Sequence, residues 1–198
     1  MKRISFKDSG GLHLTQAVLS GRKTMTRRVA YTGKIENINT GFFTEGKNKD
    51  RLALCESNFV VAKSQYGNGD VVAIQQSYSD IGDQVGYRTL QEMPLDNAGW
   101  TNKMFVKAEL MPHHIRITDV RVEWLQDISD EDCMREGVLP IWDNETEPRK
   151  IDCYDFTGSD YVYKTARTAF SCLIDKVSGR GTWDSNPLVW VYSFELVD

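Results

Sequence analysis

Residues 21–28 form the densest group of side chains that could do chemistry, with the sequence Gly-Arg-Lys-Thr-Met-Thr-Arg-Arg. Four of these eight residues are cations, in a chain whose formal net charge is -4. Cations this close together repel one another, so a folded protein exposes them to water or places an anion between them. The two threonine hydroxyls could also bond to a phosphate, a carbonyl or a base edge. The segment therefore predicts either an anion-binding site or a solvated basic turn.

The overall composition narrows the possible partners. The isoelectric point near 5.5 is too low for a protein that coats nucleic acid, because phosphate neutralisation supplies most of that affinity. We therefore expect no extended duplex binding, and a local patch that holds RNA, a single nucleotide or a modified nucleoside. The four cysteines and three histidines show no metal-ligand spacing, so no metal and no other cofactor is expected.

The chain is long enough for one domain, with 198 residues of which 40% are hydrophobic. It has no apolar run that approaches the length of a membrane span, and its first residues lack the apolar stretch of a signal peptide. We therefore expect a cytoplasmic protein with no membrane partner.

The first half of the chain predicts a short helix within residues 11–20, ended by Gly21 in a left-handed conformation. The basic segment then continues as a strand. Residues 31–68 favour a hairpin with its tip near Gly46 to Asp50, followed by a turn at 67–70 and a buried strand at 71–74.

The second half predicts a surface loop over 79–101 with a helical turn near 87–91, and strands at 104–106 and 115–124. Ser129 begins a capping box for a short helix that stops at Gly137. An excursion or loop over 138–160 follows. The clearest helix covers roughly 162–177, where apolar residues recur at three- and four-residue steps. In the last strand, 188–196, neighbouring residues face opposite sides of the sheet, and the residues of both sides could be buried.

These elements predict an α+β fold, a compact β-barrel decorated by about three helices. The whole chain, 1–198, is expected to be one domain, with insertions near 31–65, 79–101 and 138–160.

Three segments together resemble the ASCH family, whose fold is related to the PUA β-barrel of RNA-modification proteins. They are the basic segment after a short helix, the stretch from Thr118 to Gly137, and the end of the chain from Gly181 to Phe194. The chain looks most like the longer ASCH proteins of phage and prophage. Since a fold can host many functions, the resemblance predicts the architecture more firmly than the activity.

The resemblance implies two kinds of function. ASCH domains are generally proposed to bind RNA or modified nucleosides. Some small bacterial members are amidohydrolases that remove the acyl group from N4-acylated cytidine, and their catalytic lysine, threonine and glutamate match Lys23, Thr26 and Glu136 by motif position. Related phage proteins also carry a glutamate and a tryptophan after the Gly-Asp turn. This chain has Gln76 and Tyr78 there, and Gln76 keeps hydrogen-bonding capacity but cannot act as a base.

The chemistry of the three matched residues suits amide hydrolysis. Thr26 could be the nucleophile, and Lys23 could activate it if burial and neighbouring arginines lower the lysine pKa. Glu136 could orient water or return a proton to the leaving amine. Glu136 could equally be a helix-end carboxylate that pairs with a nearby arginine. Strict strand alternation places Lys23 and Thr26 on opposite faces, so the hydrolase hypothesis needs a turn or bulge between them.

Three functions therefore remain open from the sequence. A nucleic-acid or nucleoside binding module would use Arg22, Lys23, Arg27 and Arg28, with Gln76 as a hydrogen-bonding group and Tyr78 or Trp100 stacked on a base. An amidohydrolase would use Lys23, Thr26 and Glu136. A phage accessory protein would present the acidic stretch 143–160 to another protein. The first two require Lys23, Arg27 and Glu136 to line one cleft.

Overall fold

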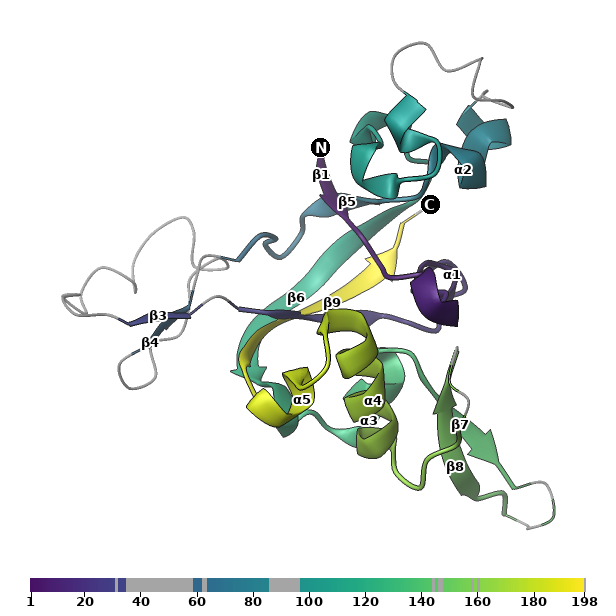
Figure 1. Cartoon of the computed structure of the whole chain (residues 1–198), viewed down its shortest axis with the longest axis vertical. Coiled ribbons are helices and arrows are strands. Elements are labelled where there is room, and N and C mark those ends of the chain that lie inside the picture. Colours follow the sequence, from purple (N-terminus) through teal and green to yellow (C-terminus); the bar gives the residue numbers. More distant parts are fainter. Residues whose placement is uncertain are drawn as a thin grey trace.

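The computed structural model describes residues 1–30, 32–34, 59–61, 64–85, 97–143, 145, 148–157, 159 and 161–197. Within these ranges the chain is α+β, as its sequence predicts, with one mixed five-stranded sheet and two two-stranded sheets. The strand order in the large sheet is β1-β5-β6-β9-β2, and the small sheets pair β3 with β4 and β7 with β8. Figure 1 shows the long strands β6 and β9 running through the middle of the molecule.

The large sheet joins the two ends of the chain. β1 (Lys2–Ile4) pairs in parallel with β5 (Val71–Ile74), and every other pairing in the sheet is antiparallel. β6 (His114–Trp124) and β9 (Leu188–Leu196) form the longest pairing, with an irregularity between Ile117 and Asp119. β2 (Met25–Val29) lies beside β9 at the sheet edge, so the basic segment does become a strand.

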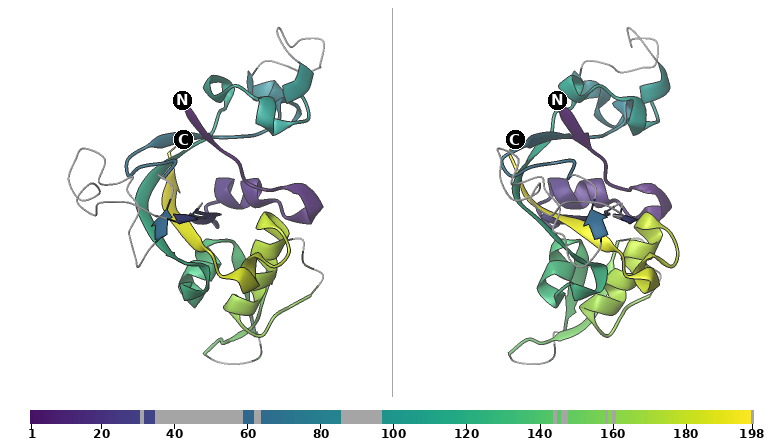
Figure 2. Two further views of the ribbon diagram at one scale, coloured as in Figure 1. Left: turned by 60° about the vertical axis from the view of Figure 1, so that its left-hand side comes forward. Right: turned by 90° about the vertical axis from the view of Figure 1, so that its left-hand side faces the viewer.

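β9 is buried on both sides from Val189 to Phe194, as its apolar alternation predicts. The sheet curves, and in Figure 2 its strands bend around α1 (Leu14–Leu19) and α4 (Ala166–Ser178). Buried residues of these two helices and of β2, β6 and β9 form one hydrophobic core. Phe170, Leu173 and Ile174, the predicted helical stripe, belong to that core.

Capping side chains fix where two helices begin. Ser129 accepts a hydrogen bond from the Asp132 amide at 3.1 Å and starts α3 (Asp130–Arg135), which confirms the predicted cap. Thr165 does the same for α4 through the Thr168 amide, so this helix begins at Ala166, later than the apolar pattern predicts. α5 (Thr182–Ser185) follows α4 directly.

The segment between β5 and β6 differs from its prediction. Residues 78–85 form α2 (Tyr78–Val85), where a loop was expected. Met104 and Phe105 lie in a 3-10 turn (Lys103–Phe105), so the predicted strand there is wrong. The Asn102 side chain caps this turn by accepting a hydrogen bond from the Met104 amide. Further 3-10 turns are Ser9–Gly11, Asn97–Gly99, Ala108–Leu110 and Leu125–Asp127.

The segment 138–160, predicted as an excursion or loop, contains a pair of strands. β7 (Val138–Trp142) and β8 (Ile151–Phe156) are antiparallel, and Tyr154 bridges to Tyr163. β3 (Thr32–Lys34) pairs with β4 (Phe59–Val61), while the predicted hairpin tip and the helical turn at 87–91 lie outside the described residues. The described helices include none with the length and hydrophobicity that a membrane span requires.

Candidate functional site

Lys23 is held in a turn between α1 and β2. Gly21 has the left-handed φ of 74°, which lets the chain reverse after α1. The Lys23 amide then donates a hydrogen bond to the Ala17 carbonyl at 2.9 Å, and the Thr24 amide donates to the Arg135 carbonyl at 3.0 Å. These two bonds tie the turn to the ends of α1 and α3, so the Lys23 side chain reaches the end of α3.

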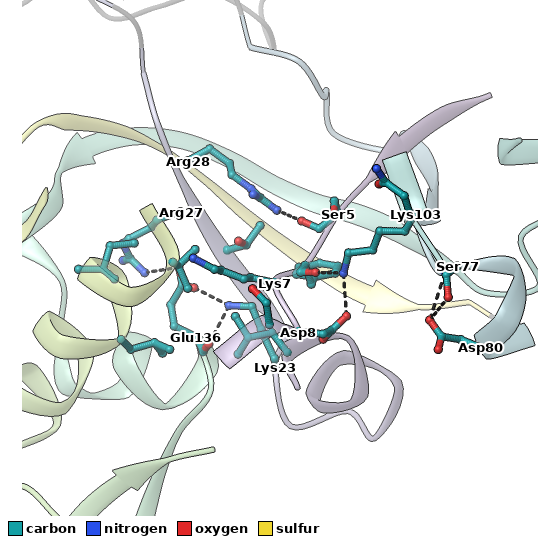
Figure 3. Close-up of a pocket in the computed structure, with 18 of the residues that line it drawn as sticks. Ser5, Lys7, Asp8, Lys23, Arg27, Arg28, Ser77, Asp80, Lys103 and Glu136 are labelled. Atoms are coloured by element: carbon teal, nitrogen blue, oxygen red, sulfur yellow. Dashed lines mark hydrogen bonds and ion pairs between the residues drawn. The ribbon is translucent and has the colours of Figure 1, made fainter. Parts of the chain in front are cut away.

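Glu136 closes α3, and its backbone and side chain both face Lys23. The chain turns away at Gly137, whose φ of 114° is a conformation that other residues rarely adopt. Lys23 Nζ donates one hydrogen bond to the Glu136 carbonyl oxygen at 2.7 Å and another to Glu136 Oε2 at 2.6 Å (Figure 3). Both side chains are buried, with exposed fractions of 3% and 5%.

Arg27 holds the second oxygen of the same carboxylate. Its Nη1 atom lies 3.2 Å from Glu136 Oε1, and its side chain is fully buried. The guanidinium also contacts Glu123 Oε1 at 2.5 Å and Asp132 Oδ2 at 3.0 Å. Arg121 in turn contacts Glu123 and Asp132. Glu136 is thus fixed by cations on both oxygens, and Arg27 is fixed by three carboxylates.

A cavity of about 470 Å³ opens beside the Lys23–Glu136 pair. Lys23, Thr26, Arg27 and Glu136 all line it. Lys23 precedes the first residue of β2, so strand alternation does not separate it from Thr26. The predicted cleft that joins Lys23, Arg27 and Glu136 is therefore present in the structure.

The rest of the wall combines apolar and charged side chains. Phe6, Leu14, Phe170, Leu173, Ile174 and Val177 supply the apolar part. Arg28, Lys7 and Lys103 also line the cavity, and Lys103 pairs with Asp8 at 2.7 Å. Ser77 and Asp80, which bond to each other, lie beyond Lys103 and Asp8 in the view of Figure 3.

Burial changes the acidity of the cations in this wall. Desolvation lowers the pKa of Lys23 from 10.5, although Glu136 acts in the opposite direction. Desolvation also lowers the pKa of Arg28. For Arg27, the carboxylates of Glu136, Glu123 and Asp132 outweigh desolvation, and the pKa is raised. Lys23 therefore gives up its proton more readily than an exposed lysine, whereas Arg27 remains a permanent cation.

Four of the predicted binding residues lie away from this wall: Arg22, Gln76, Tyr78 and Trp100. Arg22 is exposed and donates to the Ser20 hydroxyl. Tyr78 is buried in a second core cluster, and its hydroxyl accepts a hydrogen bond from the Lys107 amide. Gln76 directly precedes Ser77, and its Oε1 atom is buried without a hydrogen-bond partner among the described residues. Trp100 packs against the second cluster. Among the described residues, the aromatic rings that line the cavity are those of Phe6 and Phe170.

Lys7, Asp8 and Lys103 also line the cavity, although no motif in the sequence marks them as site residues. Lys103 Nζ donates to the Phe6 carbonyl and to Asp8, so it links the chain after β1 to the 3-10 turn at 103–105. Gln75, directly after β5, also bonds to both segments, through its amide to the Ile4 carbonyl and through its side chain to the Lys103 carbonyl. No local sequence signal marks the contact of Lys103 with Phe6 and Asp8, because these residues are nearly a hundred positions apart.

The arrangement combines a polar end, built around a buried lysine–carboxylate pair, with an apolar and cationic wall. Groups of three or more His, Cys, Asp or Glu side chains placed to hold a metal ion are absent from the described ranges. Comparison of the chain with protein-family models, curated proteins and solved structures found no match. The function is therefore inferred from the residues of the cavity.

Proposed function

We propose that the cavity binds a nucleobase-containing ligand: a modified nucleoside, a nucleotide or an RNA residue. The observation that carries this proposal is the combination of a buried Lys23–Glu136 pair with the Phe6 and Phe170 rings in one cavity. A volume of about 470 Å³ lies within the range of small-molecule sites. Apolar walls with a few fixed polar groups are typical of such sites.

The polar end has hydrogen-bonding capacity left for a ligand. An ammonium carries three N–H groups, and Lys23 uses two of them on Glu136. The third has no acceptor among the described residues, so it is available to a carbonyl such as that of a pyrimidine base. Thr26 lines the same cavity, and a threonine hydroxyl can both donate and accept a hydrogen bond.

The resemblance to the ASCH family implies the same class of ligand. We propose further that the curved five-stranded sheet belongs to a PUA-like β-barrel. The segments that carry the resemblance supply the polar residues Lys23, Thr26, Arg27, Arg28 and Glu136 to the cavity, whereas most of its apolar wall comes from α4 and Phe6.

A second candidate function is hydrolysis of an acyl group on the exocyclic amine of a cytidine-type nucleoside. The observation that favours it is that Lys23, Thr26 and Glu136 line one cavity while burial lowers the pKa of Lys23. In this reaction Thr26 attacks the amide carbonyl and Lys23 takes the threonine proton. Lys23 passes this proton to its hydrogen-bonded partner Glu136, which delivers it to the leaving amine. Water then releases the acyl group from Thr26 as a carboxylic acid.

One screen tests both candidates. The purified protein is incubated with free and N4-acylated nucleosides, binding is measured as a shift in melting temperature, and products are detected by chromatography. Binding without product supports the binding module, and release of the free nucleoside supports the hydrolase. RNA binding should show a shallow salt dependence, with a slope of about one or two released ions. Failure of every nucleoside, nucleotide and RNA to bind contradicts the proposed function.

A further inference from the structure

Two of the described cations in the cavity wall, Arg28 and Lys7, form no ion pair with a carboxylate of the described residues. Lys23 is paired with Glu136, Arg27 with three carboxylates, and Lys103 with Asp8. The charged groups of Arg28 and Lys7 have partners of another kind than these three cations. Within the described part of the chain their charged groups bond only to backbone carbonyls: Arg28 Nη2 to Ser5, and Lys7 Nζ to Lys176 at 2.5 Å.

Arg28 is positioned before any ligand arrives. It lies in β2, where it is opposite Trp190 of β9, and its guanidinium also sits 5.9 Å from the centroid of the Phe6 ring. A guanidinium has five N–H groups, and one of them is used on the Ser5 carbonyl. The others have no acceptor among the described residues, although the group is partly buried. A carbonyl dipole fixes the guanidinium without neutralising its charge.

Lys7 comes from the same short segment that holds Arg28. Ser5 supplies the carbonyl that orients Arg28, Phe6 supplies the ring beside the guanidinium, and Lys7 is the second cation. In the view of Figure 3 the Arg28 guanidinium points to Ser5, and Lys7 lies between Arg28 and Lys23. Asp80, the carboxylate of the wall that bonds to Ser77, lies beyond Lys103 in the same view.

We infer that Arg28 and Lys7 form a phosphate subsite, so that the ligand of the cavity is a nucleotide carrying a phosphate monoester. The inference rests on the proposed function, which it narrows. A phosphate monoester carries about -1.5 to -2 charges at pH 7 and three strong acceptor oxygens. That charge balances two unmatched cations. A planar guanidinium suits two phosphate oxygens at once, and a lysine supplies a flexible point charge.

The experiment compares each of the four ribonucleosides with its 5′-monophosphate by calorimetric titration at one fixed salt concentration. Ribose 5-phosphate and inorganic phosphate are titrated in parallel. The variants are Arg28→Gln and Lys7→Gln. Lys7 is exposed, so its variant keeps the test valid if Arg28→Gln fails to fold. Arg116→Gln is the matched control, because Arg116 is an exposed β6 arginine paired with Glu195 outside the cavity.

For the base that binds best, the monophosphate should bind the unaltered protein about tenfold or more tightly than the nucleoside. Arg28→Gln and Lys7→Gln should each reduce this ratio at least about threefold, and Arg116→Gln should leave it unchanged. If nucleoside and monophosphate bind equally, the phosphate subsite is overturned and the proposed function stays intact. The same conclusion follows if both variants retain the full ratio of monophosphate affinity to nucleoside affinity. Phosphate or ribose 5-phosphate binding as tightly as the nucleotides supports the subsite and contradicts nucleobase recognition. If none of the probes binds, both the phosphate subsite and the proposed function are overturned.

Discussion

Lys23 and Glu136 are 113 positions apart in the sequence, yet Lys23 Nζ lies 2.6 Å from one carboxylate oxygen of Glu136. The lysine also bonds to the backbone carbonyl of the same residue, and both side chains are buried. The end of α3 and the turn before β2 are thus joined by one ion pair, at the polar end of the cavity.

Breaking this pair on one side should destabilise the fold. Glu136→Leu leaves the Lys23 ammonium buried without its carboxylate, and we expect a loss of about 3–5 kcal/mol in the free energy of unfolding. The double variant Lys23→Met with Glu136→Leu removes both charges and should recover most of that loss. Urea unfolding of the three proteins measures this. A double variant that is less stable than Glu136→Leu alone contradicts the expected coupling.

Hydrolysis, the second candidate function, should depend on pH through the protonation of Lys23. The unprotonated amine is the active form, so turnover is lost as the pH falls through the lysine pKa and rises toward a plateau above it. Burial lowers that pKa, so the plateau should begin below pH 10.5. Lys23→Ala should abolish turnover in protein that is still folded, although it is less stable because the buried pair is broken. Thr26→Ala should be similarly damaging, and Glu136→Gln should leave a small remaining activity. Turnover that survives Lys23→Ala rules out this mechanism.

Tyr66 should make the fold sensitive to alkali. Its ring packs edge-on against Tyr192, its hydroxyl donates to the Arg3 carbonyl at 2.6 Å, and burial raises its pKa from 10.0 to about 12. Because the folded-state pKa is the higher one, the stabilisation is complete below pH 10 and is lost as the pH rises toward 12. Tyr66→Phe should be less stable at neutral pH, and its stability should decline less steeply over this range. Parallel stability curves for the two proteins, measured by urea unfolding, contradict this assignment.

Leu173 tests the packing of α4. It is 3% exposed, belongs to the main core and also lines the cavity. Leu173→Ala should cost roughly 2–5 kcal/mol of stability, because the site collapses only partly. Ser178→Ala, at the exposed end of the same helix, should change stability by less than about 0.5 kcal/mol. An unchanged melting temperature for Leu173→Ala argues against a buried α4 face.

The sequence predicts the elements whose signals are local. The apolar stripe of α4, the Ser129 cap and the alternation of β9 all follow from neighbouring residues, and each appears in the structure. The apolar triplet 104–106 favours a strand, but residues Lys103–Phe105 form a 3-10 turn. Three apolar residues have no periodicity that distinguishes the two conformations.

In the cavity, too, local sequence signals predict one part of the structure and contacts between distant residues decide the rest. Residues 21–28 are identified by their charge, and the family resemblance links them to Glu136. The role of each cation depends on its partners, which are distant in sequence. Arg22 is turned to the outside, Arg27 is enclosed by three carboxylates, and Arg28 remains unmatched within the described residues. Only the tertiary structure separates these three arginines.

Blocking the cavity sterically, with its charges retained, tests the central claim most directly. Val177 lines the wall near the end of α4 and is only partly buried, so Val177→Phe can fill the cavity at little cost to the core. Calorimetric titration with the tightest-binding nucleoside or nucleotide should give one site per chain in the unaltered protein and at least about tenfold weaker binding in Val177→Phe. Equal binding by a folded Val177→Phe protein contradicts the assignment of the ligand to this cavity.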